Sequence, residues 1–163
     1  MALNWKRFIR LLTLPKSKSG VGTNAMSQDA FEFVKNNMAE TPFHQWLLPE
    51  LFEVVADKGI IKIRLPIREE FGRLPGRPEL HGGVVAALAD IAGHAAIASQ
   101  LFHSVATIDM RVDYLRLAGG TALVAVGTVI KVGRTIGVVD VQIMDDKDKL
   151  VATSRASYLT MSV

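Results

Sequence analysis

The motif His81-Gly82-Gly83 is followed by a single acidic residue, Asp90, inside an otherwise apolar stretch. Residues 84–98 are valine, alanine, leucine and isoleucine apart from this carboxylate, one further glycine and one histidine. Burying a carboxylate among apolar groups costs free energy unless it is paired or hydrogen-bonded. Asp90 therefore either lies at a solvated edge or caps nearby backbone, or it acts as a base or nucleophile in an apolar pocket.

The two glycines favour chemistry at this position. Without Cβ atoms, they allow a ligand to approach the backbone N–H groups that are exposed at a helix start. This arrangement suits a developing oxyanion. If residues 82–101 form one α-helix, however, Gly82 and Asp90 lie about 12 Å apart along its axis, too far to act on one carbonyl in one chain. A two-fold dimer with antiparallel helices brings the two groups together, so we expect a homodimer with two equivalent sites.

Composition narrows the class of protein. The 163 residues are a one-domain length, and 49% of them are hydrophobic, an apolar content that indicates subunit contacts. The absence of cysteine excludes disulfides, thiolate metal sites and cysteine nucleophiles, and it is compatible with the cytoplasmic location that we expect. The net charge is only +3, and no basic stripe with interleaved aromatics is present, so we expect no nucleic-acid partner.

The histidines do not predict a metal site. His44, His81, His94 and His103 are scattered, and within the apolar run His94 shares a helix face with an acidic residue, Asp90. A third ligand is missing, so we interpret this pair as a hydrogen-bonded contact and expect neither a metal nor another cofactor. The apolar run is shorter than a membrane span, so we interpret it as a core helix.

Residues 1–26 differ from the rest, and we predict a basic N-terminal extension there and a single domain over residues 27–163. Apolar residues at helical spacing alternate with lysine and arginine until Pro15 and the Ser/Gly-rich stretch 17–23. Three interpretations remain open, of which we favour the first two: a helix docked on the domain, a loose tail, or a segment that contacts a membrane surface or directs targeting.

The pattern of the domain predicts helices, a hairpin, a long helix and then strands. Ser27 is the expected N-cap of a helix that runs to Met38, and Thr41-Pro42 opens a short helix towards Leu48. A helix that is apolar on nearly all sides must be covered on nearly all sides, which predicts an α+β fold with an antiparallel sheet wrapped around it. The remaining expected elements are a hairpin of residues 51–56 and 60–65, a loop over 69–80 that lines the site entrance, and strands at 106–114, 121–132, 136–144 and 150–161. Alternation over residues 106–114 predicts a half-buried strand.

In these motifs the chain resembles the hotdog-fold acyl-CoA thioesterases of the phenylacetic acid degradation (PaaI-like) type, within the hydroxybenzoyl-CoA thioesterase group. The likeness rests on His81-Gly82-Gly83 with Asp90 at its offset, on the run 107–116, and on Lys131-Val132-Gly133-Arg134-Thr135 before the next strand. It extends over about residues 28–161 by pattern and implies a hotdog fold, an α-helix wrapped by an antiparallel sheet.

The resemblance also implies hydrolysis of acyl-CoA thioesters to free acid and coenzyme A. In this mechanism Asp90 activates water or attacks the thioester carbonyl, and the Gly82 N–H of the neighbouring subunit polarises the carbonyl oxygen. Thr107 matches a hydroxyl that orients water, or it is an ordinary strand threonine. His81 is expected to fix the loop and the oxyanion turn rather than to transfer protons. Homodimers that pair into a homotetramer are common for this architecture.

For substrate binding, the resemblance points to Gly83, Gly133 and two arginines. Arg134 matches the place where family members meet the nucleotide or phosphates of coenzyme A, although an arginine in a hairpin turn is often simply solvated. Arg77 is a weaker candidate for the same anionic tail, as is Arg116.

One departure leaves a second function open. Pro75 stands six residues before the histidine, where the family often has an asparagine. A polar contact to the carbonyl or the nucleophile is then missing or supplied by another group. The alternative to hydrolysis is a non-catalytic acyl-CoA binding or sensor module on the same fold, and a dehydratase ranks last. The sequence does not determine the acyl group.

Overall fold

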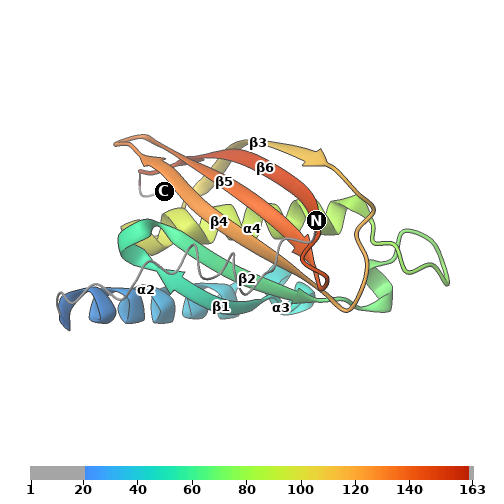
Figure 1. Cartoon of the computed structure of the whole chain (residues 1–163). Helices are drawn as coiled ribbons and strands as arrows, with labels where there is room; N and C mark the ends of the chain where they lie inside the picture. Colours follow the sequence, from blue (N-terminus) through green and yellow to red (C-terminus); the bar gives the residue numbers. More distant parts are fainter. Residues whose placement is uncertain (1–20, 162–163) are drawn as a thin grey trace.

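A curved antiparallel sheet wraps around one long helix in the computed structural model, which describes residues 21–161 (Figure 1). The six strands have the order β1-β2-β4-β5-β6-β3, so β1 and β3 form the two edges. This is the predicted hotdog architecture. Its elements are α2 (Val21–Glu40), α3 (Pro42–Leu47), β1 (Glu50–Val55), η1 (Ala56–Lys58), β2 (Ile60–Pro66), η2 (Glu69–Phe71), α4 (Gly82–Leu101), β3 (Ala106–Tyr114), β4 (Ala122–Val132), β5 (Ile136–Asp145) and β6 (Leu150–Leu159).

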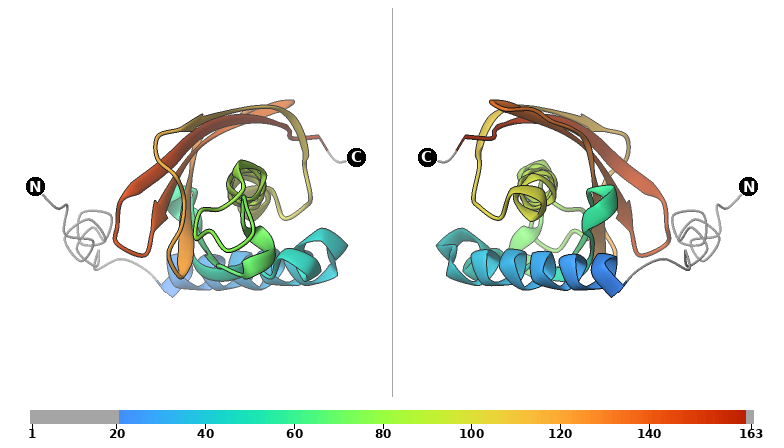
Figure 2. Two further views of the ribbon diagram at one scale, coloured as in Figure 1. Left: turned by 90° about the vertical axis from the view of Figure 1, so that its right-hand side faces the viewer. Right: turned by 90° about the vertical axis from the view of Figure 1, so that its left-hand side faces the viewer.

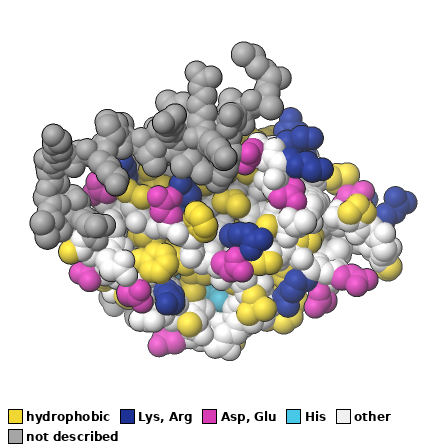
Figure 3. Space-filling model, turned by 60° about the horizontal axis from the view of Figure 1, so that its bottom comes forward, with side chains coloured by type: hydrophobic (Ala, Val, Ile, Leu, Met, Phe, Trp, Pro, Cys, Tyr) yellow, Lys and Arg dark blue, Asp and Glu magenta, His cyan; other side chains and the backbone are white. Residues whose placement is uncertain are grey.

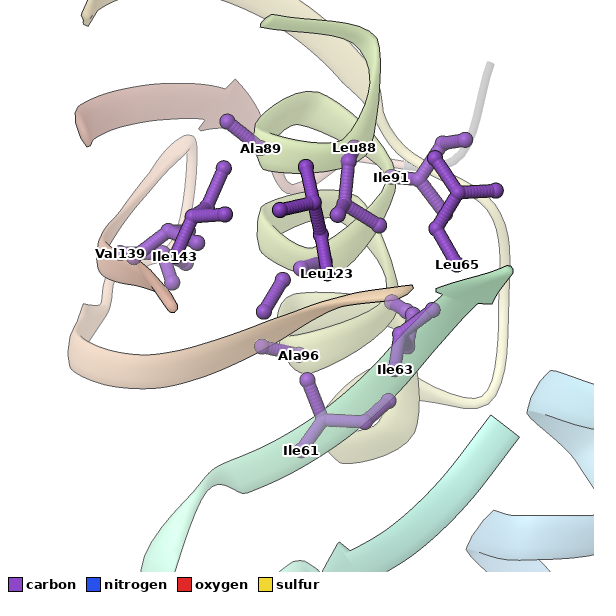
Figure 4. Close-up of a cluster of buried hydrophobic side chains, with 14 of the residues drawn as sticks. Ile61, Ile63, Leu65, Leu88, Ala89, Ile91, Ala96, Leu123, Val139 and Ile143 are labelled. Atoms are coloured by element: carbon purple, nitrogen blue, oxygen red, sulfur yellow. The ribbon is translucent and has the colours of Figure 1, made fainter. Parts of the chain in front are cut away.

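Helix α4 lies on the concave side of the sheet (Figure 2), and most of its residues are buried, so it forms the centre of the core. Leu88 and Ala96 on the helix are fully buried, and the facing side chains come from β2, β4 and β5 (Figure 4). Small residues allow the sheet to approach closely: a Cβ on Gly127 of β4 would lie 2.8 Å from the carbonyl oxygen of Ala92. The labelled side chains from the sheet are Ile61, Ile63, Leu65, Leu123, Val139 and Ile143.

The burial of α4 distinguishes a core helix from a membrane-spanning helix. The helix has 20 residues and is long and apolar enough to cross a membrane, so the argument from its shortness was wrong. Most of its apolar window is nevertheless buried inside the protein, because the sheet wraps it and α2 packs against it. It is therefore the predicted core helix.

Helix α2 begins earlier than the sequence predicted. It already includes Val21, so Ser27 is not its N-cap, and the expected boundary after residue 26 falls within the helix. The Ser27 hydroxyl accepts a hydrogen bond from the Ala56 N–H at 3.2 Å. The serine therefore contacts a different element of the fold instead of capping its own helix. The part of the expected basic extension before residue 21 lies outside the described residues.

Strand β3 is present as predicted, but it is less covered than its alternation indicated. Ile108 is 54% exposed and Tyr114 is also 54% exposed. The reason is its place in the sheet: β3 pairs only with β6, and a register shift between Thr107 and Asp109 interrupts the ladder. An edge strand with exposed apolar side chains is a surface that another chain can cover.

Replacing Leu88 by alanine should lower the free energy of unfolding by about 2–5 kcal/mol, because its side chain is fully buried between α4 and the sheet. The matched control is Leu74→Ala, whose side chain is 53% exposed in the loop before α4 and should change stability by less than about 0.5 kcal/mol. Urea unfolding measures both. Equal small effects would contradict the packing of α4.

Candidate active site

The start of α4 leaves one backbone donor open. His81 is the N-cap, and its Nδ1 accepts a hydrogen bond from the Gly83 N–H at 3.0 Å. The Val84 N–H donates to the His81 carbonyl oxygen, also at 3.0 Å. Within residues 21–161, no acceptor is found for the Gly82 N–H. The hydrogen bond from Gly83 to the His81 ring agrees with the expected role of His81 in fixing this turn. The Gly82 N–H is free for a ligand.

Packing within the chain does not require glycine at position 82. A Cβ there would meet the ring of Tyr114 at 3.4 Å, an ordinary van der Waals contact. The Tyr114 hydroxyl donates to the Gly82 carbonyl oxygen at 3.1 Å and so holds the helix start against β3. Packing therefore does not explain why position 82 is glycine. The lack of a side chain would, however, allow a ligand to come close to this N–H.

An apolar hollow of about 330 Å³ adjoins this helix start. Two aromatic side chains of α3, Phe43 and Trp46, stack on one another with ring centroids 6.0 Å apart and form one side of it. The predicted entrance loop contributes to the rim. The complete lining is Phe43, Trp46, Leu47, Glu70, Gly72, His81, Gly83, Val84 and Ala87.

On the face where α2 and α3 lie, hydrophobic side chains alternate with both kinds of charge (Figure 3). The part of this face that is visible shows no continuous basic patch.

Asp90 lies half-buried in the middle of α4, where the strand β3 passes the helix. The Thr107 hydroxyl donates to Asp90 Oδ1 at 2.8 Å, so the structure brings together two residues that the sequence singled out separately. The single Tyr158 O–H points at two acceptors of Asp90, its carbonyl oxygen at 3.2 Å and the same Oδ1 at 3.5 Å. The carboxylate thus has hydrogen-bonding partners as well as apolar neighbours.

Burial disfavours the charged form of two histidines near this carboxylate. Burial lowers the pKa of His94 below its ordinary value, the charge of Asp90 opposes this shift and His44 adds to it. Burial likewise lowers the pKa of His44, against the opposing charge of Asp90. The Val105 N–H donates to His94 Nε2 at 3.4 Å, so the expected contact of His94 is with backbone rather than with Asp90. Among residues 21–161, no cluster of three or more histidine, aspartate or glutamate side chains could hold a metal.

Three further residues predicted to bind substrate lie at opposite ends of the molecule. Arg77 belongs to the loop before α4 and borders a separate surface hollow. Gly133 and Arg134 form the turn between β4 and β5, which lies near the C-terminal half of α4, since a Cβ on Gly137 would meet Ile97 at 2.6 Å. In Figure 1 this turn and the loop before α4 lie at opposite ends of the molecule. One chain alone does not bring the two arginines together.

Tyr114, Tyr158 and His44 were missed by the sequence interpretation. Tyr114 is part of the alternating pattern that predicts β3, yet nothing in that pattern indicates a hydrogen bond to Gly82. Tyr158 pairs across strands with Thr107, a neighbour far away in sequence, so only the strand register places it beside Asp90. His44 comes from the short helix α3, whose packing the local sequence does not specify.

Comparisons with protein families and with known proteins all point to thioesterases or esterases. Residues 79–152 match the family described as Thioesterase superfamily. A provisionally named esterase of Halobacterium salinarum is 37% identical over 114 residues, which cover 63% of this chain and 75% of that protein. The medium/long-chain acyl-CoA thioesterase YigI of Escherichia coli is 30% identical over 95 residues, 49% of this chain. The chain spans only 61% of the length of YigI.

Solved structures agree with this comparison. A crystal structure of a thioesterase-superfamily protein is 35% identical, with a TM-score of 0.75 over 80% of this chain and 98% of that one. The PaaI protein of E. coli, from the phenylacetic acid degradation operon, has the same TM-score of 0.75 at 22% identity, over 84% of this chain and 96% of PaaI. At that identity the likeness to PaaI concerns the fold.

Stability should decrease on acidification because of the two histidines. Their folded pKa values lie below the ordinary 6.5, so the unfolded chain takes up protons first. Their contribution is present above about pH 6.5 and is lost as the pH falls towards the folded values. His94→Gln should flatten this dependence, since the amide oxygen can still accept from the Val105 N–H but does not titrate.

Urea unfolding of the wild type and of His94→Gln between about pH 8 and pH 5 measures the slope of the free energy of unfolding against pH. His103→Gln is the matched control, because His103 lies just after α4, is only partly buried and has its Nδ1 2.9 Å from the carbonyl oxygen of the neighbouring Ser104. This variant should keep the wild-type slope. A His94→Gln protein with the full wild-type slope would show that the buried imidazole is not responsible.

Proposed function

This chain belongs to the thioesterase superfamily and is a thioester hydrolase, and on that premise we propose that it hydrolyses acyl-CoA thioesters at sites shared by two subunits. One observation supports this most strongly. A carboxylate with a hydroxyl partner, Asp90 with Thr107, and an open N–H at Gly82 lie on the same helix. At about 12 Å of axial separation they form two halves of a site rather than one whole site.

A two-fold dimer that pairs the β3 edges would join these halves. The exposed apolar side chains of Ile108 and Tyr114 and the unpaired edge of β3 support such an interface. Pairing of the edges in antiparallel fashion sets the two α4 helices side by side in opposite directions. The start of one helix then lies beside Asp90 of the other. Association of two such dimers into a tetramer remains a prediction.

In this dimer the thioester carbonyl oxygen accepts a hydrogen bond from the Gly82 N–H of one subunit. The helix N-terminus adds its positive partial charge, which stabilises the oxyanion as it forms. Asp90 of the other subunit takes a proton from the attacking water, or it attacks the carbonyl carbon and forms an anhydride that water cleaves. The carbon–sulfur bond breaks, and coenzyme A leaves as a thiolate that becomes protonated.

The same dimer would bring the predicted substrate-binding residues of its two subunits close to one site. The β4–β5 turn lies beside the C-terminal half of α4, which in an antiparallel pair is next to the helix start of the other subunit. Arg134 from one subunit and Arg77 from the other would then border one site, where exposed guanidinium groups suit the phosphates of coenzyme A. The hollow lined by Phe43 and Trp46 adjoins Gly83 and suits an apolar or aromatic acyl group.

One observation favours the non-catalytic alternative. Pro75 is exposed and lies at a separate hollow of the loop, so it supplies no polar side chain near Gly82 or Asp90. A family member that lacks the asparagine could bind acyl-CoA without turnover. Release of thiol by the purified protein separates the two functions.

Replacing Asp90 by asparagine should lower kcat on acyl-CoA substrates by at least about a hundredfold, because the amide neither accepts a proton nor attacks the carbonyl. Release of free thiol from a panel of acyl-CoAs measures the rate, and circular dichroism checks the fold. Asp57→Asn, in the exposed turn between β1 and β2, is the matched control and should retain the wild-type rate. Equal rates for Asp90→Asn and wild type would remove Asp90 from the mechanism, and tight binding without any turnover by wild type would select the binding module.

A further inference from the structure

We propose that Tyr158 is a positioning residue for this hydrolysis: together with Thr107 it holds one oxygen of Asp90 and leaves the other oxygen for the reaction. The proposal rests on the proposed function. It assigns a role to a residue that no motif in the sequence singled out.

Two strands deliver two hydroxyls to one carboxylate oxygen. Thr107 of β3 and Tyr158 of β6 are cross-strand partners in the antiparallel ladder, so their side chains lie on the same face of the sheet. The Thr107 hydroxyl donates to Asp90 Oδ1 at 2.8 Å, and the Tyr158 hydroxyl lies 3.5 Å from that same atom. Within residues 21–161, no side chain donates to Oδ2. The two oxygens of Asp90 are therefore distinguished by their contacts.

Helix α4 is shaped to admit the phenol. A Cβ on Gly93 would lie 2.1 Å from the Tyr158 hydroxyl oxygen, far inside any permitted contact. Glycine at position 93 therefore makes room for the hydroxyl within one turn of Asp90. The Tyr158 ring is fully buried, and phenylalanine would fill the core equally well without the polar atom. The space made for this hydroxyl indicates that its contacts with Asp90 matter.

The phenol remains a hydrogen-bond donor over the working pH range. Burial, and then the negative charge of Asp90, raise the pKa of Tyr158 well above its ordinary value, so it stays protonated. The other titratable groups that act on this carboxylate or are acted on by it are His94 on α4 and His44 on α3, and burial lowers the pKa of both. Near neutral pH the hydroxyls of Thr107 and Tyr158 are then the donors that orient Asp90.

The test is Tyr158→Phe, which keeps the ring and removes only the hydroxyl. We expect kcat on an acyl-CoA that the wild type hydrolyses to fall about tenfold with KM little changed, because a misoriented carboxylate reacts slowly but the binding surfaces remain. Ser154→Ala is the matched control.

Ser154 lies on the same strand and the same face as Tyr158, is buried, and its hydroxyl has no partner within the described part of the chain. Its removal should leave kcat and KM unchanged. A second measurement places Tyr158→Phe in the Asp90→Asn background, where it should cause no further loss, because its effect passes through the carboxylate.

Two outcomes would overturn the proposal. One is a wild-type kcat for Tyr158→Phe, and the other is an equal further loss in the Asp90→Asn background, which would indicate a structural role. Both differ from failure of the proposed function. In that case the wild type itself would release no thiol from any acyl-CoA, or Asp90→Asn would be as fast as wild type.

Discussion

Asp90 carries a carboxylate on a helix that the sheet buries along most of its length, although burying a charge costs free energy. The arrangement of the candidate site depends on how the fold reconciles this charge with the burial of α4. The apolar side chains of α4 pack against the concave sheet, where charge would be costly. Asp90 instead faces the region near the β3 edge, where Thr107 and Tyr158 supply hydroxyl donors. The edge that leaves the carboxylate reachable is also the edge that a second subunit would cover.

Much of the fold follows from local pattern. The bounds of α4 and of the strands agree closely with the apolar periodicity and the glycine-containing turns, because burial selects those periods directly. Ser27 shows where local signals fail: a serine before an apolar run is a typical N-cap, but its hydroxyl is used by Ala56 from another element and the helix continues past it. The exposure of β3 likewise depends on strand order, which alternation alone does not encode.

The site was predictable to the extent that its residues belong to one motif. His81, Gly82 and Asp90 are close in sequence and could be found together, and their spacing along a helix is the reason to propose a site shared by two copies of the chain. Tyr158 and His44 come from distant elements and carry no signal of their own; strand register brings Tyr158 beside Thr107. Tertiary pairing, rather than composition, decides which hydroxyl reaches a carboxylate.

The division of the site between subunits is tested most directly with mixed dimers. Gly82 is the first residue of α4 and His81 before it is extended, so Gly82→Pro fits the backbone and removes the N–H. Gly82→Pro and Asp90→Asn proteins should each be nearly inactive. After they are unfolded together and refolded as an equal mixture, about one quarter of the wild-type thioesterase activity should return, because half of the dimers contain one intact site of two. A mixture as inactive as its components, with heterodimers verified, would contradict a site that two subunits share.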